Sequence, residues 1–395
     1  MKNFIFISPN FPSNYWRFCR ELKNNGYNVL GIGDCPFDYL SKDVIASLNE
    51  YYWVESLENY EEVYRAVAFF IFKYGKIDYI ESNNEYWLER DAMLRTAFNV
   101  TTGFKQTDIK KIKYKSRMKK YYQKAGVKTA KYCLVKSLNV CRKFIEDAGY
   151  PVIVKPDNGV GANNTYKLKN DEELVSFLEN KPDIPYIMEE FIDAQVNSYD
   201  AIIDAKGNPV FETGNVTAVD LMDTVNEDGN CAYYIVNKLA PDVLDAGRRT
   251  VKAFGVKSRF VHFEFFRLKR NQRIGNKGEV VGLEVNMRPA GGFTPDMMNY
   301  ANSADVYKIW ADVLTYGTAE AVCGEKYYCA YAGRRDGKEF KYCEQDIRDF
   351  YGANLKAVAR IPDALSGAMA NTMYLANFKT KEELDKFYED IMQLR

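Results

Sequence analysis

Two stretches of the sequence carry polar residues in step with a two-residue repeat. In the first stretch these are His262 and Glu264, and in the second they are Glu284, Asn286 and Arg288. Side chains alternate between the two faces of a strand, so residues two apart share a face. If the two stretches pair as a hairpin, both polar faces can point to the same side. The pattern then predicts a patch of two carboxylates, one amide and one guanidinium.

This patch has a definite chemistry. Two close carboxylates repel each other unless a cation or a shared proton lies between them. Carboxylate and amide oxygens are hard ligands that suit Mg²⁺ or Mn²⁺ rather than zinc. A neighbouring arginine can bind a phosphate or a carboxylate with two hydrogen bonds. A solvent-exposed strand face with a surface salt bridge explains the same pattern equally well.

A lysine and a glycine-containing loop form a second group of interest. Lys155 ends the apolar stretch 151–155, and the loop 157–164 with Gly159 and Gly161 follows. Glycines let backbone N–H groups approach phosphates, and a lysine adds a point charge. The loop matches neither the Walker A nor the GxGxxG pattern, so those mechanisms do not apply. Taken alone, the loop is best interpreted as an ordinary turn.

A third group lies at the end of the strand-like stretch 185–191. Glu189 and Glu190 are followed by apolar residues, among them Ile192. An acid beside apolar neighbours suits an adenine, which needs hydrogen bonds at its edge and stacking on its faces. Solvated acids at a strand end are the preferred interpretation of this piece alone.

The elements that must position these groups alternate between strands and helices. Strands are expected at 3–7, 28–33 and 77–80, and helices at 15–24, 60–72 and 85–98. This alternation predicts a parallel sheet covered on both faces.

Further along the chain, two hairpins and several helix starts are expected. The hairpins lie at 199–213 and 259–288. Asn170 with Glu173, and Thr380 with Glu383, predict capped helix starts. A further helix is expected at 304–316.

Composition excludes several classes of protein. The 395 residues contain 54 basic and 54 acidic residues, so no global charge attracts nucleic acid or membranes. The basic run at 105–124 is interpreted as a solvated helix, because no aromatic platform accompanies it. A single histidine excludes multi-histidine metal sites.

Cysteine usage and hydropathy indicate a compartment. The eight cysteines contain no CxxC pair and are expected to be reduced. The apolar cluster at 69–72 is far shorter than the roughly 20 residues of a membrane span. We expect a soluble, cytoplasmic protein.

Five motifs occur in an order that resembles the ATP-grasp superfamily. They are YKSRMK (114–119), PVIVKP (151–156), MEEFI (188–192), HFEF (262–265) and EVNMRPAGG (284–292). The resemblance covers roughly residues 1–310, and the last two motifs are most similar to amino-acid and dipeptide ligases. It implies an α/β fold, α+β in part, in four regions. These are an N-terminal parallel-sheet domain (1–110), a lid (111–190), a central antiparallel-sheet domain (191–320) and a small C-terminal extension (321–395).

The resemblance also implies roles for individual residues. The nucleotide site would contain Lys115, Lys155, Gly159, Gly161, Glu189, Glu190 and Ile192. Two Mg²⁺ ions, with Mn²⁺ as the alternative, would bind Glu264, Glu284 and Asn286. Arg288 would stabilise the transferring phosphoryl group, with Lys155 as its catalytic partner, and the substrate would meet Arg288, Gly291, Gly292 and His262. His262 is either a base for the incoming amine or a structural residue.

The implied reaction joins a small carboxylate to an amine. The carboxylate attacks the γ-phosphate of ATP, giving an acyl phosphate and ADP, and the amine then displaces phosphate. Two departures from the family pattern concern nucleotide binding. The loop reads Gly161-Ala162-Asn163-Asn164 without the usual serine, and the ribose-binding acid is missing near Val196 and Asn197.

Alternatives to this reaction stay open. They are a catalytically reduced ATP-binding or regulatory protein of the same fold, a thiol ligase and a carboxylase. No nucleic-acid or membrane partner is expected, and a homodimer is left open.

Overall fold

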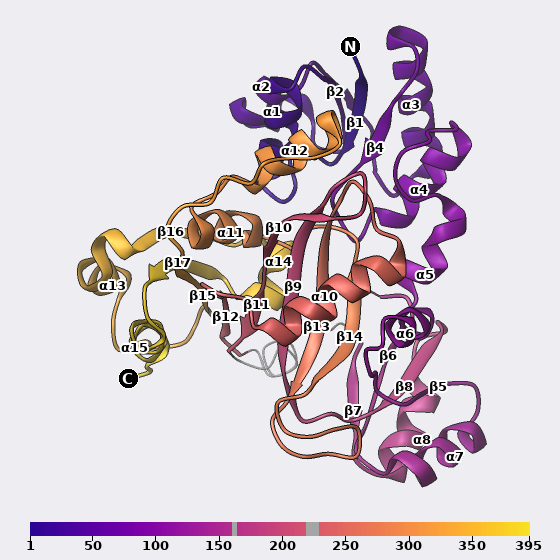
Figure 1. Cartoon of the computed structure of the whole chain (residues 1–395), viewed down its shortest axis with the longest axis vertical. Helices are drawn as coiled ribbons and strands as arrows, with labels where there is room; N and C mark the ends of the chain where they lie inside the picture. Colours follow the sequence, from indigo (N-terminus) through magenta and orange to yellow (C-terminus); the bar gives the residue numbers. More distant parts are fainter. Residues whose placement is uncertain (160–163, 219–228) are drawn as a thin grey trace.

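The computed structural model describes residues 1–159, 164–218 and 229–395. Within these residues the strands form three sheets (Figure 1). A parallel sheet lies at the top of the view, a large sheet occupies the middle and extends to the left, and a small sheet lies at the lower right. Gly161 and its neighbours to Asn163 lie outside the described residues.

The N-terminal sheet is parallel, as the alternating pattern predicts, with strand order β3-β2-β1-β4. Its strands are β1 Asn3–Ile7, β2 Asn28–Gly33, β3 Glu50–Trp53 and β4 Tyr79–Glu81. Its helices are α1 Trp16–Asn24, α2 Lys42–Ser47, α3 Tyr60–Tyr74 and α4 Leu88–Ala97. Both central strands are buried throughout, as expected for a sheet covered on two faces. The carboxyl ends of β1 and β4 therefore lie side by side at one edge.

The small sheet has strand order β5-β8-β6-β7. Its strands are β5 Tyr132–Leu134, β6 Val152–Pro156, β7 Tyr166–Leu168 and β8 Tyr186–Glu190. Helices α7 Leu138–Ala148 and α8 Asp171–Asn180 belong to the same region of the chain. The predicted cap of α8 is confirmed, because the Asn170 side chain accepts the Glu173 N–H at 2.9 Å.

The large sheet has strand order β14-β13-β9-β11-β12-β15-β17-β16, and β10 pairs with β9. Its strands are β9 Ala194–Ile203, β10 Pro209–Thr213, β11 Asn215–Thr217, β12 Cys231–Ile235, β13 Arg259–Leu268, β14 Val280–Asn286, β15 Tyr328–Arg334, β16 Leu355–Arg360 and β17 Thr372–Phe378. Its strands pair in antiparallel fashion, and both predicted hairpins are confirmed.

The remaining helices after residue 240 lie along this sheet or join it to the first one. They are α10 Pro241–Phe254, α11 Thr294–Asn302, α12 Val306–Tyr316, α13 Glu344–Tyr351, α14 Asp363–Met369 and α15 Lys381–Met392. The predicted capping box of α15 is confirmed. Helix α12 ends at Tyr316, as predicted, and lies beside α1 (Figure 1), so the chain returns to the N-terminal sheet.

The basic run at 105–124 is not one solvated helix. It forms α5 Ile109–Lys113 and α6 Lys115–Lys124, separated by the extended backbone of Tyr114. Lys113, Lys115 and Lys119 are buried, so the prediction of a solvated face is wrong for them. The cause is tertiary packing, because α6 is pressed against the β13–β14 hairpin, where the Tyr122 hydroxyl bonds two strand carbonyls.

Apolar side chains from several of the four predicted regions pack together. One apolar cluster combines Phe4 and Phe6 of the first sheet with Trp310 of α12 and Leu375 of β17. The N-terminal sheet, the large sheet and the C-terminal part thus share a core, and the predicted boundaries stay a prediction. No helix in the described residues has the length and hydropathy needed to cross a membrane.

Candidate active site

The β13–β14 hairpin brings the predicted polar residues onto one face. Glu264 pairs directly with Glu284, and His262 pairs with Asn286. The alternate residues Phe263 and Val285 are fully buried on the other face. Directly opposed residues of an antiparallel pair have Cβ atoms about 4.5–5.5 Å apart. The two carboxylates therefore lie close enough to share a cation.

His262 is held between two acids. Its Nδ1 lies 2.7 Å from Asp200 Oδ1, and its Nε2 lies 3.2 Å from Glu264 Oε1. Burial alone would lower the pKa of His262, but the two carboxylates outweigh it and raise the pKa to about 9. A protonated imidazole donates from both nitrogens and has no lone pair for a proton. This geometry favours the structural interpretation of His262 over its interpretation as a base.

Asp200 was not singled out from the sequence. It lies on β9 directly opposite His262 and is completely buried. The Ser198 hydroxyl donates to its second carboxylate oxygen. Only the sheet order, which places β9 beside β13, brings this acid to the site.

Lys115 connects the hairpin to the glycine-containing loop. Its ammonium lies 3.2 Å from Glu284 Oε1 and donates to the Gly159 carbonyl at 3.0 Å. The start of α6 is held by the same loop, since Asp157 accepts the Ser116 N–H and hydroxyl, both at 2.7 Å. A carboxylate at a helix N-terminus satisfies free N–H groups and the helix dipole. The loop and the acidic hairpin are therefore fixed relative to each other through α6.

Lys155 takes part in a buried ion triad. Its ammonium lies 2.7 Å from Glu189 Oε2, and Lys119 pairs with the other oxygen of the same carboxylate. Burial would raise the pKa of Glu189, but the two ammonium groups outweigh it and lower the pKa to about 2. Lys119 was missed in the sequence, although it follows Lys115 by four residues and so shares its helix face.

This triad bears on the predicted adenine site. Both Glu189 oxygens are engaged by lysines, so its side chain is committed to positioning them. Glu190 Oε1 accepts the Lys131 N–H at 2.7 Å, and Ile192 is buried. The contribution of these three residues to adenine binding stays a prediction.

Arg288 lies at the end of the hairpin and faces an acid from the N-terminal sheet. Its Nε is 3.6 Å from Glu85 Oε2, and neither atom has a hydrogen-bond partner within the described residues. Burial raises the pKa of Glu85, although Arg288 opposes the shift. Glu85 was expected inside a helix starting at that residue, but α4 starts at Leu88. Its place just after β4, at the carboxyl edge of a parallel sheet where ligands commonly bind, is the signal that could have identified it.

More unpartnered polar atoms lie at the same edge. Asn10 Oδ1, Asn14 Oδ1 and Asn83 Nδ2 are buried without a hydrogen-bond partner in the described residues. The Asn14 amide donates to the Gly292 carbonyl at 3.1 Å, so the loop after β1 meets the glycine pair after Arg288. Buried polar groups are nearly always satisfied, and such a cluster indicates a place for a polar ligand.

The glycine pair after Arg288 is covered by the C-terminal part of the chain. Gly292 has φ +62°, and a Cβ there would lie 2.6 Å from Met369 Cε of α14. At Gly291 a Cβ would meet nothing within 4 Å. Helix α14 thus contributes to the surroundings of Arg288, a role that the sequence pattern did not indicate.

The donor set can be tested against Mg²⁺. Within the described residues no three His, Cys, Asp or Glu side chains form a metal-binding group. The set at the hairpin has two carboxylates and the Asn286 amide, which suits an ion that completes its shell with water and phosphate oxygens. The residues present therefore fit a nucleotide-bound Mg²⁺ better than a metal held by protein alone.

The missing ribose acid has no replacement at the expected position. Asn197 is buried on β9, and its amide donates to the Gln195 carbonyl at 3.2 Å. Ribose recognition is therefore not explained by this stretch.

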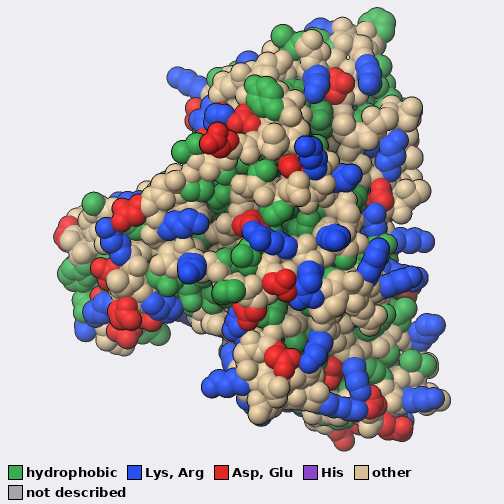
Figure 2. Space-filling model, in the orientation of Figure 1, with side chains coloured by type: hydrophobic (Ala, Val, Ile, Leu, Met, Phe, Trp, Pro, Cys, Tyr) green, Lys and Arg blue, Asp and Glu red, His purple; other side chains and the backbone are tan. Residues whose placement is uncertain are grey.

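Figure 2 shows basic and acidic side chains interspersed over the face that it presents, without one large patch of a single sign. The single histidine does not appear on this face, in agreement with the burial of His262.

Comparisons with known proteins agree with this fold. Residues 120–290 match the model of the ATP-grasp domain family. The carbamoyl phosphate synthase large chain of Helicobacter pylori is 26% identical over 166 residues, which are 40% of this chain and 15% of that protein. D-alanine--D-alanine ligase B of Clostridium perfringens is 38% identical over 81 residues, 20% of this chain and 27% of that one. The chain thus spans only a small part of the length of these relatives.

Solved structures match over nearly the whole chain. The L-amino acid ligase from Bacillus licheniformis has a TM-score of 0.75 at 16% identity, covering 99% of this chain and 97% of that one. The biotin carboxylase domain of the Hydrogenobacter thermophilus 2-oxoglutarate carboxylase, solved with MgADP, has a TM-score of 0.72 at 14% identity, covering 100% and 90%. At these identities the likeness shows the fold alone.

Proposed function

Because the chain carries an ATP-grasp domain at residues 120–290 within a fold shared by ligases of this superfamily, we propose that it is a carboxylate–amine ligase releasing ADP and phosphate. One observation carries the proposal. Glu264 and Glu284 oppose each other on a hairpin that also presents Asn286 and ends at Arg288. The two acids and the amide would hold Mg²⁺, and this ion together with the Arg288 guanidinium would neutralise charge on a transferring phosphoryl group. Phosphoryl transfer needs positioning and charge stabilisation more than a protein nucleophile.

The nucleotide would lie between the small sheet and the hairpin. Lys115 and Lys155 would bind its phosphates, and Glu189 would hold Lys155 in place. The loop that includes Gly159 would cover the phosphates through its backbone N–H groups. Glu264, Glu284 and Asn286 would hold Mg²⁺, which supplies charge neutralisation when bound.

The substrate would lie at the edge where Arg288 meets Glu85. The guanidinium binds the carboxylate that is phosphorylated and then the acyl phosphate. Glu85 Oε2, which has no hydrogen-bond partner in the described residues, accepts a hydrogen bond from an ammonium or amine. A buried cation and a buried anion side by side suit a zwitterion, so we infer that at least one substrate is an amino acid.

The two steps follow from this placement. A carboxylate oxygen attacks the γ-phosphorus and the bond to ADP breaks, giving an acyl phosphate. The amine nitrogen then attacks the acyl carbon, phosphate leaves, and the amine proton passes to solvent or phosphate. His262, already protonated between two acids, orients Glu264 rather than removing this proton.

The test is a hydroxamate assay. The protein is incubated with ATP, Mg²⁺, hydroxylamine and each of the twenty amino acids, and hydroxamate, ADP and AMP are measured. We expect hydroxamate with ADP and phosphate for at least one amino acid. Glu284→Gln should abolish the product, whereas Glu279→Gln, which alters a surface ion pair with Lys128 next to the same strand, should not. AMP with pyrophosphate, or equal activity of both variants, contradicts the proposed mechanism.

A further inference from the structure

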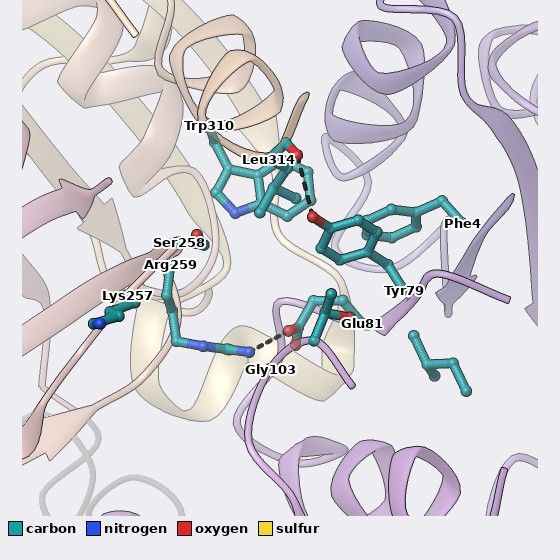
Figure 3. Close-up of a pocket in the computed structure, with 11 residues that line it drawn as sticks. Phe4, Tyr79, Glu81, Gly103, Lys257, Ser258, Arg259, Trp310 and Leu314 are labelled. Carbon is teal, nitrogen blue, oxygen red and sulfur yellow. Dashed lines mark hydrogen bonds and ion pairs between the residues drawn. The ribbon is translucent and has the colours of Figure 1, made fainter. Parts of the chain in front are cut away.

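The N-terminal sheet meets the hairpin of the candidate active site along a buried seam (Figure 3). On one side of the seam Glu81 ends β4, and on the other side Arg259 begins β13. Both side chains are buried, and Figure 3 shows Arg259 extending toward Glu81. The two proposed substrate-binding groups come from the same two sides, because Glu85 follows β4 and Arg288 follows β14. The contacts that hold the seam together therefore bear on the distance between these groups.

Arg259 makes one hydrogen bond to each side of the seam. Its Nη2 donates to Glu81 Oε2 at 2.5 Å, and its Nη1 donates to the Met287 carbonyl at 2.8 Å. Met287 directly precedes Arg288 in the chain. Because the two nitrogens belong to one rigid planar guanidinium, the two acceptors are held at a fixed separation. The backbone just before Arg288 is thereby fixed to the end of β4.

Further contacts fix this guanidinium and its acceptor. The guanidinium lies over the ring of Phe104, 4.9 Å from the ring centroid, and a cation above an aromatic face is attracted to it. Burial would raise the pKa of Glu81, but Arg259 and Arg95 outweigh it, and the net shift is downward. The Glu81 carboxylate is therefore a charged acceptor, which makes its bond from Arg259 a strong one. Arg95 also donates to the Ile80 carbonyl at 2.5 Å and so binds the backbone of β4.

The loop between Glu81 and Glu85 is fixed to the helices of the N-terminal sheet. Its first residue, Ser82, donates its N–H and its hydroxyl to Asp91 Oδ2 of α4, at 3.0 and 2.7 Å. The carbonyl of the following residue accepts the hydroxyl of Tyr15, just before α1, at 3.0 Å. Glu81 and Glu85 thus belong to one braced unit, and a contact that fixes Glu81 also fixes Glu85.

We propose that Arg259 is a positioning residue, which sets the separation of Arg288 and Glu85 by joining the Met287 carbonyl to Glu81. The inference rests on the proposed function, because Arg288 and Glu85 are the groups proposed to bind the amino acid. A zwitterion meets both groups at hydrogen-bond distance only when their separation matches its own length. Arg259 acts through these two residues and does not contact the substrate.

The test is the kinetics of Arg259→Lys in the hydroxamate assay, with the amino acid that the unaltered protein uses. A lysine keeps the positive charge, but its single ammonium lacks the two-nitrogen fork that spans both acceptors. We expect the KM for the amino acid to rise about tenfold or more, because a small misplacement of one binding group weakens binding steeply. The KM for ATP should stay unchanged, because Lys115 and Lys155 lie on α6 and β6, which are not part of the seam.

Arg334→Lys is the matched control. Arg334 is a buried arginine of β15 that donates to two carbonyls in the C-terminal part of the chain, Ile391 at 2.7 Å and Tyr342 at 2.9 Å. Its replacement breaks a comparable pair of bonds at another place in the fold. It should therefore lower the unfolding temperature, as Arg259→Lys does, without changing either KM.

Glu81→Gln is the second variant if Arg259→Lys does not fold. The amide keeps the shape and one acceptor oxygen, but a neutral acceptor binds a guanidinium less strongly than a carboxylate, and we expect the amino-acid KM to rise about threefold. If the unaltered protein forms no hydroxamate, the proposed function fails and this inference fails with it. If the unaltered protein is active, an unchanged amino-acid KM in Arg259→Lys or Glu81→Gln, or an equal rise in both KM values, would overturn the positioning role and leave the proposed function standing.

Discussion

Two acids of the site, Glu189 and Glu85, are both buried beside cations but differ in how well they are paired. Glu189 has an ammonium on each oxygen, and its pKa is lowered to about 2. Glu85 faces one guanidinium at 3.6 Å, and its pKa is raised. Removing one partner of a fully paired buried charge is strongly destabilising, whereas a poorly paired buried charge already carries an uncompensated desolvation cost. The ion pairs of Glu189 are therefore complete within the protein, whereas in the proposed function a substrate completes those of Glu85.

The largest expected effect is a loss of stability when Glu189 is replaced. Glu189→Gln leaves two buried lysines without their acid, and breaking a buried pair in this way costs about 3–5 kcal/mol. Chemical denaturation should show this loss, while Glu190→Gln at the neighbouring half-buried position should change stability little.

The lowered pKa of Glu189 predicts that stability depends on pH. Because the folded pKa of Glu189 is about 2 and its ordinary value is 4.5, its stabilisation is present above pH 4.5 and is lost as the pH falls toward 2. The Glu189→Gln variant should lack this part of the acid transition. Equal stability of the two Gln variants would contradict the pairing.

The next largest effect is expected on catalysis, at Arg288, which faces Glu85. Arg288→Met removes the guanidinium that stabilises developing charge, and we expect ADP formation to fall about 10²- to 10³-fold. Arg267→Met is the control, because Arg267 lies on β13 of the same hairpin but pairs with Asp242 of α10. If both variants turn over ATP at the same rate, Arg288 has no role in the reaction.

A smaller effect is expected on nucleotide affinity. Lys155→Met removes a charged hydrogen bond to phosphate, worth about 1.5–3 kcal/mol, or roughly ten- to a hundredfold in the ATP dissociation constant. Lys119 remains to pair with Glu189, so the fold should persist. Lys128→Met, at a surface ion pair, is the control. Unchanged ATP affinity in Lys155→Met would show that Lys155 does not bind the phosphates and only pairs with Glu189.

The smallest effect is expected at Glu85. Because burial raises its pKa, the ionised carboxylate works against folding, with a penalty that grows as the pH rises above 4.5. Glu85→Gln should therefore leave stability at pH 7 unchanged or slightly higher, by about 1 kcal/mol or less. It should raise the KM for the amino acid. A clear loss of stability in Glu85→Gln would contradict the difference in pairing between Glu85 and Glu189.

Much of the hairpin could be predicted from the sequence because alternation along a strand is a local property of the backbone. The pattern from Glu284 to Arg288 places alternate side chains on one face wherever the strand lies. Helix caps such as Asn170 are also local, because the donor and acceptor are three residues apart. The parallel N-terminal sheet followed from the regular alternation of strands and helices.

Only the tertiary structure decided which buried charges face each other. Asp200 meets His262 because β9 lies beside β13, and Glu85 meets Arg288 because the edge of the first sheet abuts the hairpin. Lys119 belongs to a basic run that the sequence alone suggests is solvated, and packing of α6 buries it. Met369 reaches Gly292 from the far end of the chain. Each of these contacts depends on how sheets pack, which no local repeat encodes, and the low dielectric of the interior then gives them their effect.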